Sequence, residues 1–353
     1  MKKALLVAVA LAALGFAGPA GAATYQVAVG ELARPPAGTP KMATLNQFFP
    51  SRLVIHAGDK VTFSNFGFHT VTYLKGGQPA PLFVPDGTKY AALNDAAGTP
   101  FGFSSLDKLI YNIPAFVPSG GKVIDGSKSV SSGVLFGPTE NKPGKITFTF
   151  PKAGTYKLIC LVHGPMMSVT IVVKPASAQI ASPKAVARTA ASQTAAAWRG
   201  IKALDAAAAP PANTVWAGLG NKGTILGYYP KRLTVKAGTS VTFVLKAPME
   251  IHDVAFGPLD YIEQLMKSTD LFPDSPTAAN QASPLLVYGS DPGQASGVYD
   301  GSNHGNGFYA SPLLGNGPGM LKQFSIRFTK AGTYHYVCLV HGPDMSGDIV
   351  VTP

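Results

Sequence analysis

The chain of 353 residues is poor in cysteine, in charge and in long apolar runs, and each scarcity excludes a class of protein. With only two cysteines, Cys160 and Cys338, it is not a disulfide-rich scaffold. Charged residues make up 13% of the chain, about half of the usual share of roughly 25%. The net charge of +11 comes from basic residues that are scattered singly. Nucleic-acid-binding surfaces need clustered basic residues, so no nucleic-acid partner is predicted.

After the first 23 residues, no apolar run is long enough to span a bilayer. Residues 1–23 have the pattern of an export signal. Lys2 and Lys3 precede an apolar stretch over 4–17, and small residues follow at Ala20-Gly21-Ala22. The apolar stretch is itself too short for a membrane span. We therefore expect a mature protein without a transmembrane segment, located in the periplasm or secreted.

Glycine and proline are abundant, with 39 and 30 residues, and they divide the chain into short segments. Several segments alternate apolar and polar residues with the period of a half-buried strand, for example 146–150 and 324–328. Short strands separated by turns are typical of antiparallel sandwiches with Greek-key connections. Composition and pattern together predict an all-β fold and argue against a helical bundle.

The sequence also repeats itself. Residues 48–63 are identical to residues 228–243 at 8 of 16 positions, and 152–173 are identical to 330–351 at 16 of 22 positions. The offsets between the blocks, 180 and 178, are nearly equal, and the blocks keep their order. A tandem duplication of one β-sandwich domain of roughly 140 to 150 residues explains both matches.

The duplication sets the organisation of the chain. We expect an export signal, a first domain, a linker and a second domain, over residues 1–23, 24–175, 176–212 and 213–353 respectively. Strong helix formers fill the alanine-rich linker up to Pro210, so the linker is predicted to be helical. The middle of each domain, 75–130 and 257–305, lacks clear alternation and is predicted to form long loops, with one short helix at 260–268.

Each repeat carries an upstream histidine, a cysteine, a second histidine three residues later and a methionine. The eight residues are His69, Cys160, His163 and Met167 in the first repeat, and His252, Cys338, His341 and Met345 in the second. A thiolate, two imidazoles and a weak axial thioether form the ligand set that suits blue copper. A cysteine at the end of a strand and a tight Gly-Pro loop behind the second histidine bring three of these groups together. Each repeat is therefore predicted to hold one copper.

The axial methionine of the first repeat needs a choice, because Met166 and Met167 are adjacent. Spacing alone allows either residue. At the offset of 178, Met167 aligns with Met345, whereas Met166 aligns with Asp344, whose carboxylate makes a harder ligand. We therefore predict Met167 and Met345 as axial ligands and Met166 as a surface or rim residue.

At these residues the sequence resembles the cupredoxin family, the plastocyanin- and azurin-like blue copper proteins. The motif of an upstream histidine, C-x2-H and a following methionine occurs twice, and the resemblance covers both repeats. It implies a Greek-key β-sandwich for each domain, two type 1 copper sites and one-electron transfer with soluble or membrane-bound redox proteins as partners. The upstream histidine precedes the cysteine by 91 residues in the first repeat and by 86 in the second, a longer separation than in the small single-domain carriers. The family pattern leaves these inserted loops unexplained.

Other interpretations of the cysteine and histidine pairs are weaker. Zinc accepts both residue types, but a thioether is a poor zinc ligand and neither repeat has a second thiolate. A nucleophilic cysteine needs a base and an orienting group in a cleft. The occurrence of the Cys-His pair beside a methionine in both repeats argues against this interpretation. Both cysteines are expected to bind metal in separate cores, so no disulfide is predicted between them. The remaining histidines, His56, His304 and His335, lack a histidine counterpart. His56 and His335 align with lysines and are therefore predicted to be exposed, whereas His304 lies in a Gly- and Asn-rich loop and has no assigned function.

Three classes of function remain open. The first is an electron carrier, and the second is a two-domain copper enzyme that resembles nitrite reductases or small laccases. Such enzymes need further metal sites, but the sequence has no His-x-His pair, and the residues before the two cysteines are Ile159 and Val337. Substrate chemistry at an open metal position would have no ligands to support it. Electron transfer is therefore favoured over an enzyme, with copper buffering or delivery as the third class.

Overall fold

The computed structural model describes residues 21–31, 35–138, 142–268 and 281–353. Residues 1–20 of the predicted export signal lie outside this described part. Strands predominate over helices in it, as the composition predicts, and they form four larger sheets and one two-stranded sheet. No helix among the described residues is long and apolar enough to cross a membrane.

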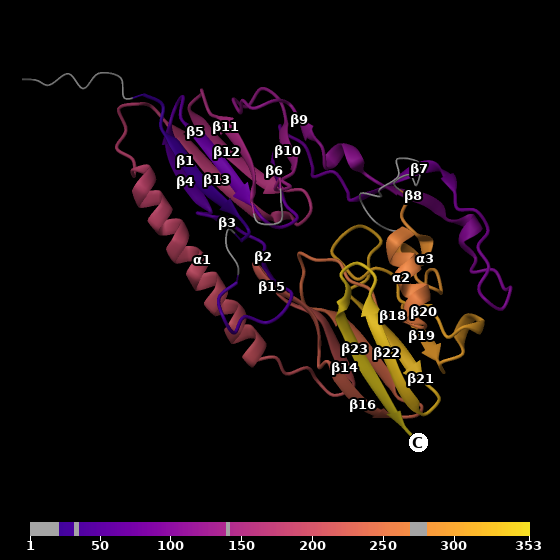
Figure 1. Ribbon diagram of the computed structural model, residues 1–353. Coiled ribbons are helices and arrows are strands. Elements are labelled where there is room, and N and C mark those ends of the chain that lie inside the picture. The colour runs from indigo at the N-terminus through magenta and orange to yellow at the C-terminus, as the bar shows by residue number, and fades with distance from the viewer. Residues whose placement is uncertain (1–20, 32–34, 139–141, 269–280) are drawn as a thin grey trace, which may run out of the picture.

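The N-terminal half builds two sheets that share one apolar core (Figure 1). The four-stranded sheet has the order β11 (Gly144–Thr149), β5 (Lys60–Asn65), β1 (Thr24–Val29) and β3 (Phe48–Phe49). The six-stranded sheet has the order β4 (Arg52–His56), β13 (Gly164–Lys174), β12 (Gly154–Cys160), β6 (Thr70–Tyr73), β10 (Val130–Val134) and β9 (Pro118–Ser119).

The C-terminal half is built in the same way, with one strand borrowed from the N-terminal half. Its six-stranded sheet has the order β19 (Ser296–Tyr299), β21 (Gln323–Phe328), β17 (Ser240–Leu245), β14 (Thr214–Gly220), β15 (Gly223–Tyr229) and β2 (Ala43–Leu45). Its five-stranded sheet has the order β16 (Arg232–Lys236), β23 (Gly342–Thr352), β22 (Gly332–Cys338), β18 (Ala255–Phe256) and β20 (Tyr309–Ala310).

Strand registers correspond between the halves. In the antiparallel pair β12–β13, Gly154 lies opposite Val173, and in β22–β23, Gly332 lies opposite Val351. In each half the last strand also pairs in parallel with a strand of the first matching sequence block, β4 or β16. The matching blocks thus occupy equivalent positions in the sheets, because the same residues alternate toward the core in both.

The cysteine-bearing strands end inside these cores. Alternating apolar residues of β12 and β22 are buried along each strand, and burial becomes continuous toward its end. The clusters around them are rich in aromatic rings, such as Phe148 in the N-terminal half and Tyr336 in the C-terminal half. Burying one such side chain contributes about 1.5–3 kcal/mol. The two cysteines are therefore held at the ends of well-packed strands.

Strand β2 joins the two halves at a sheet edge. Leu45 lies opposite Gly223 and Ala43 opposite Ile225, so this N-terminal segment completes the edge of a C-terminal sheet. The chain then returns to the N-terminal half, where β3 pairs with β1. The short segment between these strands holds Asn46, whose backbone N–H donates to the carbonyl of Lys222 at 2.7 Å.

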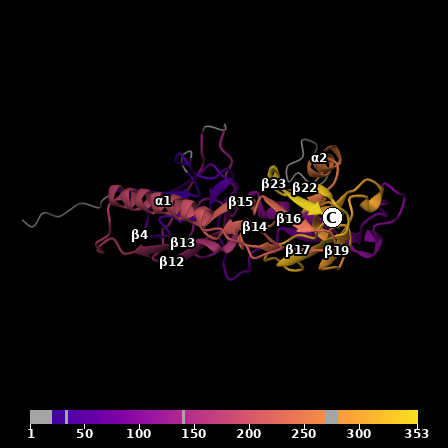
Figure 2. The same cartoon turned by 90° about the horizontal axis from the view of Figure 1, so that it is seen from below.

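The linker is helical, as predicted, and forms α1 (Pro183–Ala206). Ser182 caps its N-terminus by accepting a hydrogen bond from the backbone N–H of Ala185 at 3.3 Å. Trp198 and Ile201 are buried in an apolar cluster that contains residues of both halves. In Figures 1 and 2, α1 lies along the N-terminal half and its C-terminal end reaches β14 and β15, so it fastens the two halves together as well as connecting them in sequence.

The long inserted segments pack on one another. The first forms the hairpin β7 (Phe83–Lys89) and β8 (Asp107–Tyr111) and the short 3₁₀ helices Phe103–Ser105 and Ile113–Ala115, none of which the sequence pattern predicts. The second contains α2 (Leu259–Ser268), which confirms the predicted short helix, as well as α3 (Pro284–Tyr288) and the 3₁₀ turn Asn303–Gly305. Tyr90 and Phe103 of the first insertion share an apolar cluster with Leu285 of the second and with Phe308, which follows it. In Figure 1 the hairpin accordingly lies beside α2 and α3.

Candidate metal centres

The structure brings His69, Cys160 and His163 together at one end of the N-terminal core. Cys160 is the last residue of β12, His163 lies in the loop between β12 and β13, and His69 directly precedes β6. Cys160 Sγ is 3.5 Å from His163 Nδ1 and 3.9 Å from His69 Nδ1, and the two Nδ1 atoms are 3.1 Å apart. All three side chains are buried.

The second cluster repeats this geometry with His252, Cys338 and His341. Cys338 Sγ is 3.5 Å from His341 Nδ1 and 4.0 Å from His252 Nδ1, and the two Nδ1 atoms are 3.2 Å apart. The register of β22 against β23 shifts at Cys338, which pairs with Gly342 and closes the loop that carries His341. The same shift occurs at the first cysteine.

These donor sets fit one metal ion each. A metal bound at about 2.0–2.1 Å from nitrogen and about 2.3 Å from sulfur separates its ligand atoms by roughly 3.3–3.8 Å, and the separations in both clusters lie around this range. One thiolate with two imidazoles matches a trigonal copper site. Met167 and Met345 are fully buried in the same cores as the cysteines, whereas Met166 is 46% exposed. This placement agrees with the choice of Met167 made from the repeat, while its role as an axial ligand remains a prediction.

The side chain of the residue that follows each upstream histidine anchors the metal-binding loop. In the N-terminal half, the backbone N–H of Leu161 donates to Thr70 Oγ1 at 2.7 Å. In the C-terminal half, the backbone N–H of Leu339 donates to Asp253 Oδ1, also at 2.7 Å. The anchors are equivalent in position but differ in chemistry, because one is a neutral hydroxyl and the other a buried carboxyl group.

Two glycines close the far side of the upstream histidines. Gly30 has φ +71° and Gly218 has φ +66°. A Cβ at Gly30 would lie 2.6 Å from His69 Nε2, and one at Gly218 would lie 2.4 Å from His252 Nε2. Only glycine combines this backbone conformation with such a close approach to the ring. Neither glycine is predicted from the sequence, because both lie outside the matching blocks.

Charges at the first cluster favour the thiolate. Burial opposes ionisation of Cys160, but the adjacent His163 and His69 outweigh it and hold the pKa of the thiol well below its usual value. Burial also opposes protonation of His163, yet the Cys160 thiolate and the nearby Glu250 raise the pKa of this imidazole to about 10. The charges of the first cluster therefore favour a thiolate at Cys160 beside a protonated His163.

In the second cluster, burial shifts the pKa values of the cysteine and the histidines toward their neutral forms. Burial raises the pKa of Cys338 well above its usual value, and the carboxyl group of Asp253 raises it further. Burial lowers the pKa of His341, and it lowers that of His252 much further. Burial also raises the pKa of Asp253 to about 7. Burial therefore favours the neutral thiol and the neutral imidazoles in the second cluster, even though its geometry is nearly the same as that of the first.

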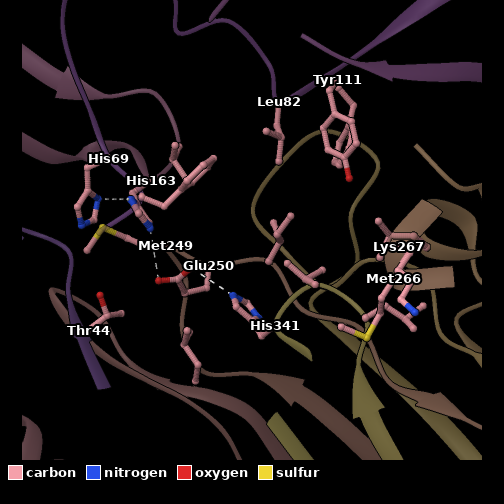
Figure 3. A pocket seen from close by; sticks show the side chains of 18 residues that line it. Thr44, His69, Leu82, Tyr111, His163, Met249, Glu250, Met266, Lys267 and His341 are labelled. Atoms are coloured by element: carbon pink, nitrogen blue, oxygen red, sulfur yellow. Dashed lines mark hydrogen bonds and ion pairs between the residues drawn. The ribbon is translucent and has the colours of Figure 1, made fainter. Parts of the chain in front are cut away.

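Glu250 lies between the two clusters, and the sequence analysis did not single it out. Its Oε1 is 3.5 Å from His163 Nε2 and its Oε2 is 3.9 Å from His341 Nε2, as Figure 3 shows. Burial opposes ionisation of the carboxyl group, but the hydrogen bond and charge of His163 lower its pKa to about 2. The first repeat has Gly67 two residues before its upstream histidine, where the second has Glu250. The internal repeat therefore gave no signal for this residue.

A cavity of about 710 Å³ opens beside Glu250, between the halves. Its wall includes His163 and His341, so the second histidine of each cluster faces the other half across this space (Figure 3). Leu82 and Tyr111 of the first insertion and Met266 of α2 also line it. The inserted segments thus help to enclose the region between the two clusters.

The three histidines without counterparts differ in exposure. His335 is exposed, as predicted, and forms an ion pair with Asp348 at 2.9 Å. The predicted exposure of His56 is wrong. His56 is partly buried, with Nε2 2.8 Å from the carbonyl oxygen of Ala178, because the segment before α1 folds over it. His304 is partly buried against the first insertion, where its Nδ1 is 3.1 Å from Asp95 Oδ2.

No family model and no curated protein matches the chain. Among solved structures, the chain is similar to a Cu(I) form of amicyanin, with 21% identity over 42% of this chain and 90% of that one and a TM-score of 0.22. It is also similar to a purple cupredoxin from Nitrosopumilus maritimus, with 16% identity over 40% of this chain and 100% of that one and a TM-score of 0.22. A third similar structure is that of auracyanin A, a blue copper protein from Chloroflexus aurantiacus, with 20% identity over 41% of this chain and 100% of that one and a TM-score of 0.25.

Proposed function

We propose that the protein is an exported blue copper protein that transfers single electrons between redox partners. It holds one type 1 copper in each of two tandem Greek-key β-sandwich domains, residues 24–175 and 213–353. The observation that carries this proposal is the pair of buried clusters, each with one cysteine Sγ and two histidine Nδ1 atoms at metal-ligand separations.

The proposed ligands are the eight residues predicted from the sequence. They are His69, Cys160, His163 and Met167 in the first site, and His252, Cys338, His341 and Met345 in the second. Bound copper supplies a one-electron couple at each site, and the thiolate ligand gives the oxidised form its colour. The solved structures to which the chain is similar include one that is named a blue copper protein and one that is named a purple cupredoxin.

The surroundings of the ligands suit an electron carrier, because they resist rearrangement. Each cysteine ends a strand that pairs on both sides, and the next residue is hydrogen-bonded to Thr70 or Asp253. Gly30 and Gly218 pack against the upstream histidines. A ligand cage with fixed positions changes little between the two oxidation states, and this lowers the barrier to electron transfer.

Export and redox partners complete the proposal. The charged, apolar and small-residue pattern over 1–23 supports cleavage and a periplasmic or secreted location. The partners are soluble or membrane-bound redox proteins. The diffuse positive charge of the chain favours association with a partner surface of opposite sign.

The test is copper content and the absorption spectrum of the purified protein. We expect two coppers per chain and an intense thiolate-to-copper band near roughly 600 nm in the oxidised form. Cys160→Ser and Cys338→Ser are each expected to remove one site's share of this band and leave the other site intact. Bound zinc without the band, or turnover of nitrite or of a phenol with oxygen, would contradict the proposal.

A further inference from the structure

The second histidines of the two clusters point their free nitrogens at the same carboxylate. In each cluster the Nδ1 atoms face the cysteine, so the Nε2 atoms of His163 and His341 lie on the far side of their rings. Both Nε2 atoms approach Glu250, and each approaches a different oxygen of it, at 3.5 and 3.9 Å. Figure 3 shows His163, Glu250 and His341 as one continuous row.

This arrangement departs from the usual role of a carboxylate near a metal site. A histidine that binds metal through one nitrogen commonly donates its other N–H to a carboxylate, which fixes the orientation of the ring. Here a single carboxylate lies within ion-pair distance of two such histidines, one from each half of the chain. Its side chain is only 10% exposed, so the contact with the two rings is largely shielded from bulk solvent.

The N-terminal half also holds Glu250 in this position. Asn46 Nδ2 donates to Glu250 Oε1 at 2.5 Å and to Thr224 Oγ1 at 3.3 Å. Asn46 lies between β2, which belongs to a C-terminal sheet, and β3, which belongs to an N-terminal one. The neighbouring Met249 packs into the core of the N-terminal half. The bridge is therefore anchored in both halves.

We propose that Glu250 couples the two metal sites by linking His163 to His341, and that it carries electron exchange between them. This inference rests on the proposed function of the two clusters. In the exchange one site is oxidised by one electron and the other is reduced by the same electron. No bond is made or broken, and no other reactant is needed. The gap between the two Nε2 atoms is at most about 10 Å, which is the two contact distances plus the width of a carboxylate.

The coupling makes the protein a two-electron store rather than two independent carriers. An electron that enters at either site equilibrates with the other before it leaves. The second histidines of the two sites, His163 and His341, face Glu250 and the adjoining cavity. A partner that reaches only one half of the molecule therefore has access to both electrons.

The experiment compares the copper-loaded full-length protein with Glu250→Ala, Glu250→Gln and a control, Glu263→Ala, which changes an exposed glutamate of α2. A radiolytic pulse delivers less than one electron per oxidised chain, and absorption follows the redistribution. The separate spectra of Cys160→Ser and Cys338→Ser identify each site. The wild type is expected to show a first-order phase whose rate does not depend on protein concentration.

Glu250→Ala is expected to slow this phase at least about tenfold, the low end of the effect of losing an outer-shell carboxylate, with both absorption bands and the copper content retained. Glu250→Gln is expected to slow it less, because an amide oxygen still accepts from one histidine. It serves as the decisive variant if the alanine variant does not fold. Glu263→Ala is expected to match the wild type.

Three results would overturn the inference. An unchanged rate in the Glu250 variants would exclude the carboxylate as the link. A wild type with two blue sites but no first-order phase would exclude exchange and leave the proposed function standing. A third copper that disappears in Glu250→Ala would make the carboxylate and the two Nε2 atoms a metal site of their own. Absence of the blue bands would instead refute the proposed function, and the inference with it.

Discussion

Replacing Gly218 by alanine tests whether close packing of glycine against the upstream histidine fixes the second site. The added Cβ would lie 2.4 Å from His252 Nε2 and 2.5 Å from the Cβ of Ala247, well inside van der Waals contact. His252 and Ala247 are both fully buried, so neither can relieve the overlap by moving into solvent. We expect His252 to move away from Cys338, with loss of stability and of the second site's copper band.

The magnitude follows from two contributions. The left-handed backbone, with φ +66° at this position, costs a residue with a Cβ about 1–2 kcal/mol. Overpacking of a buried site adds about 1–3 kcal/mol. Gly218→Ala is therefore expected to lower the free energy of unfolding of the C-terminal half by about 2–5 kcal/mol.

The chain supplies a matched control. Gly238 has φ +88°, but a Cβ there would meet nothing within 4 Å. Gly238→Ala therefore carries only the backbone cost of about 1–2 kcal/mol. The N-terminal half offers the same comparison, because a Cβ at Gly30 would crowd His69, whereas Gly58, with φ +93°, is open.

The assay is equilibrium urea unfolding of the metal-free variants, together with absorption spectra after copper loading. Gly218→Ala is expected to alter the second site's band and leave the first site's band unchanged, and Gly30→Ala is expected to do the reverse. Gly238→Ala is expected to leave both bands intact. Equal destabilisation by Gly218→Ala and Gly238→Ala, with unchanged spectra, would refute the argument from close packing.

Three further predictions concern other parts of the molecule. Met167→Gln is expected to change the absorption of the first site only, since this side chain is fully buried beside the ligands, whereas Met166→Gln, at a position that is 46% exposed, is expected to leave the spectrum unchanged. Metal-free protein is expected to contain two free thiols, of which only Cys160 is ionised at neutral pH. Because its folded pKa is lowered, the thiolate stabilises the fold above the ordinary thiol pKa, and this contribution is lost as the pH falls through the folded value. Ultraviolet thiolate absorbance against pH checks this, and two thiolates or none would contradict it. Trp198→Ala is expected to cost about 3–5 kcal/mol of stability because the ring is buried between the halves, whereas the exposed neighbour Arg199→Ala is expected to cost within about 0.5 kcal/mol. Urea unfolding measures both, and equal effects would show that α1 does not fasten the halves.

Local sequence patterns predicted the parts of the structure that depend on local periodicity. Alternation predicted the strands, strong helix formers predicted α1, and the ligand spacing predicted which side chains meet in each cluster. The choice between Met166 and Met167 by alignment of the repeats agrees with their burial. These signals are readable because each strand or helix repeats its pattern within a few residues.

The missed features all depend on contacts between distant segments. Glu250 meets His163 only because the two halves face each other, and no periodic pattern marks a single glutamate before a ligand. Strand β2 pairs with a segment of the other half, and the hairpin β7–β8 packs on a cluster built mostly by residues of the C-terminal half. Such pairings depend on how the halves dock, which the composition of either segment does not encode.

The borrowed strand β2 also has a consequence for biogenesis. As the chain emerges N-terminus first, β2 appears long before its partner, because Gly223 follows Leu45 by 178 residues. At roughly 5–20 residues per second, the strand waits on the order of 10–35 seconds with its backbone groups unpaired. An unpaired strand is a template for aberrant association, so a ribosome stall between the two halves would leave a nascent chain prone to aggregate. The N-terminal half cut off at residue 175 carries the same liability permanently, because the only sheet that takes up β2 is built by the C-terminal half.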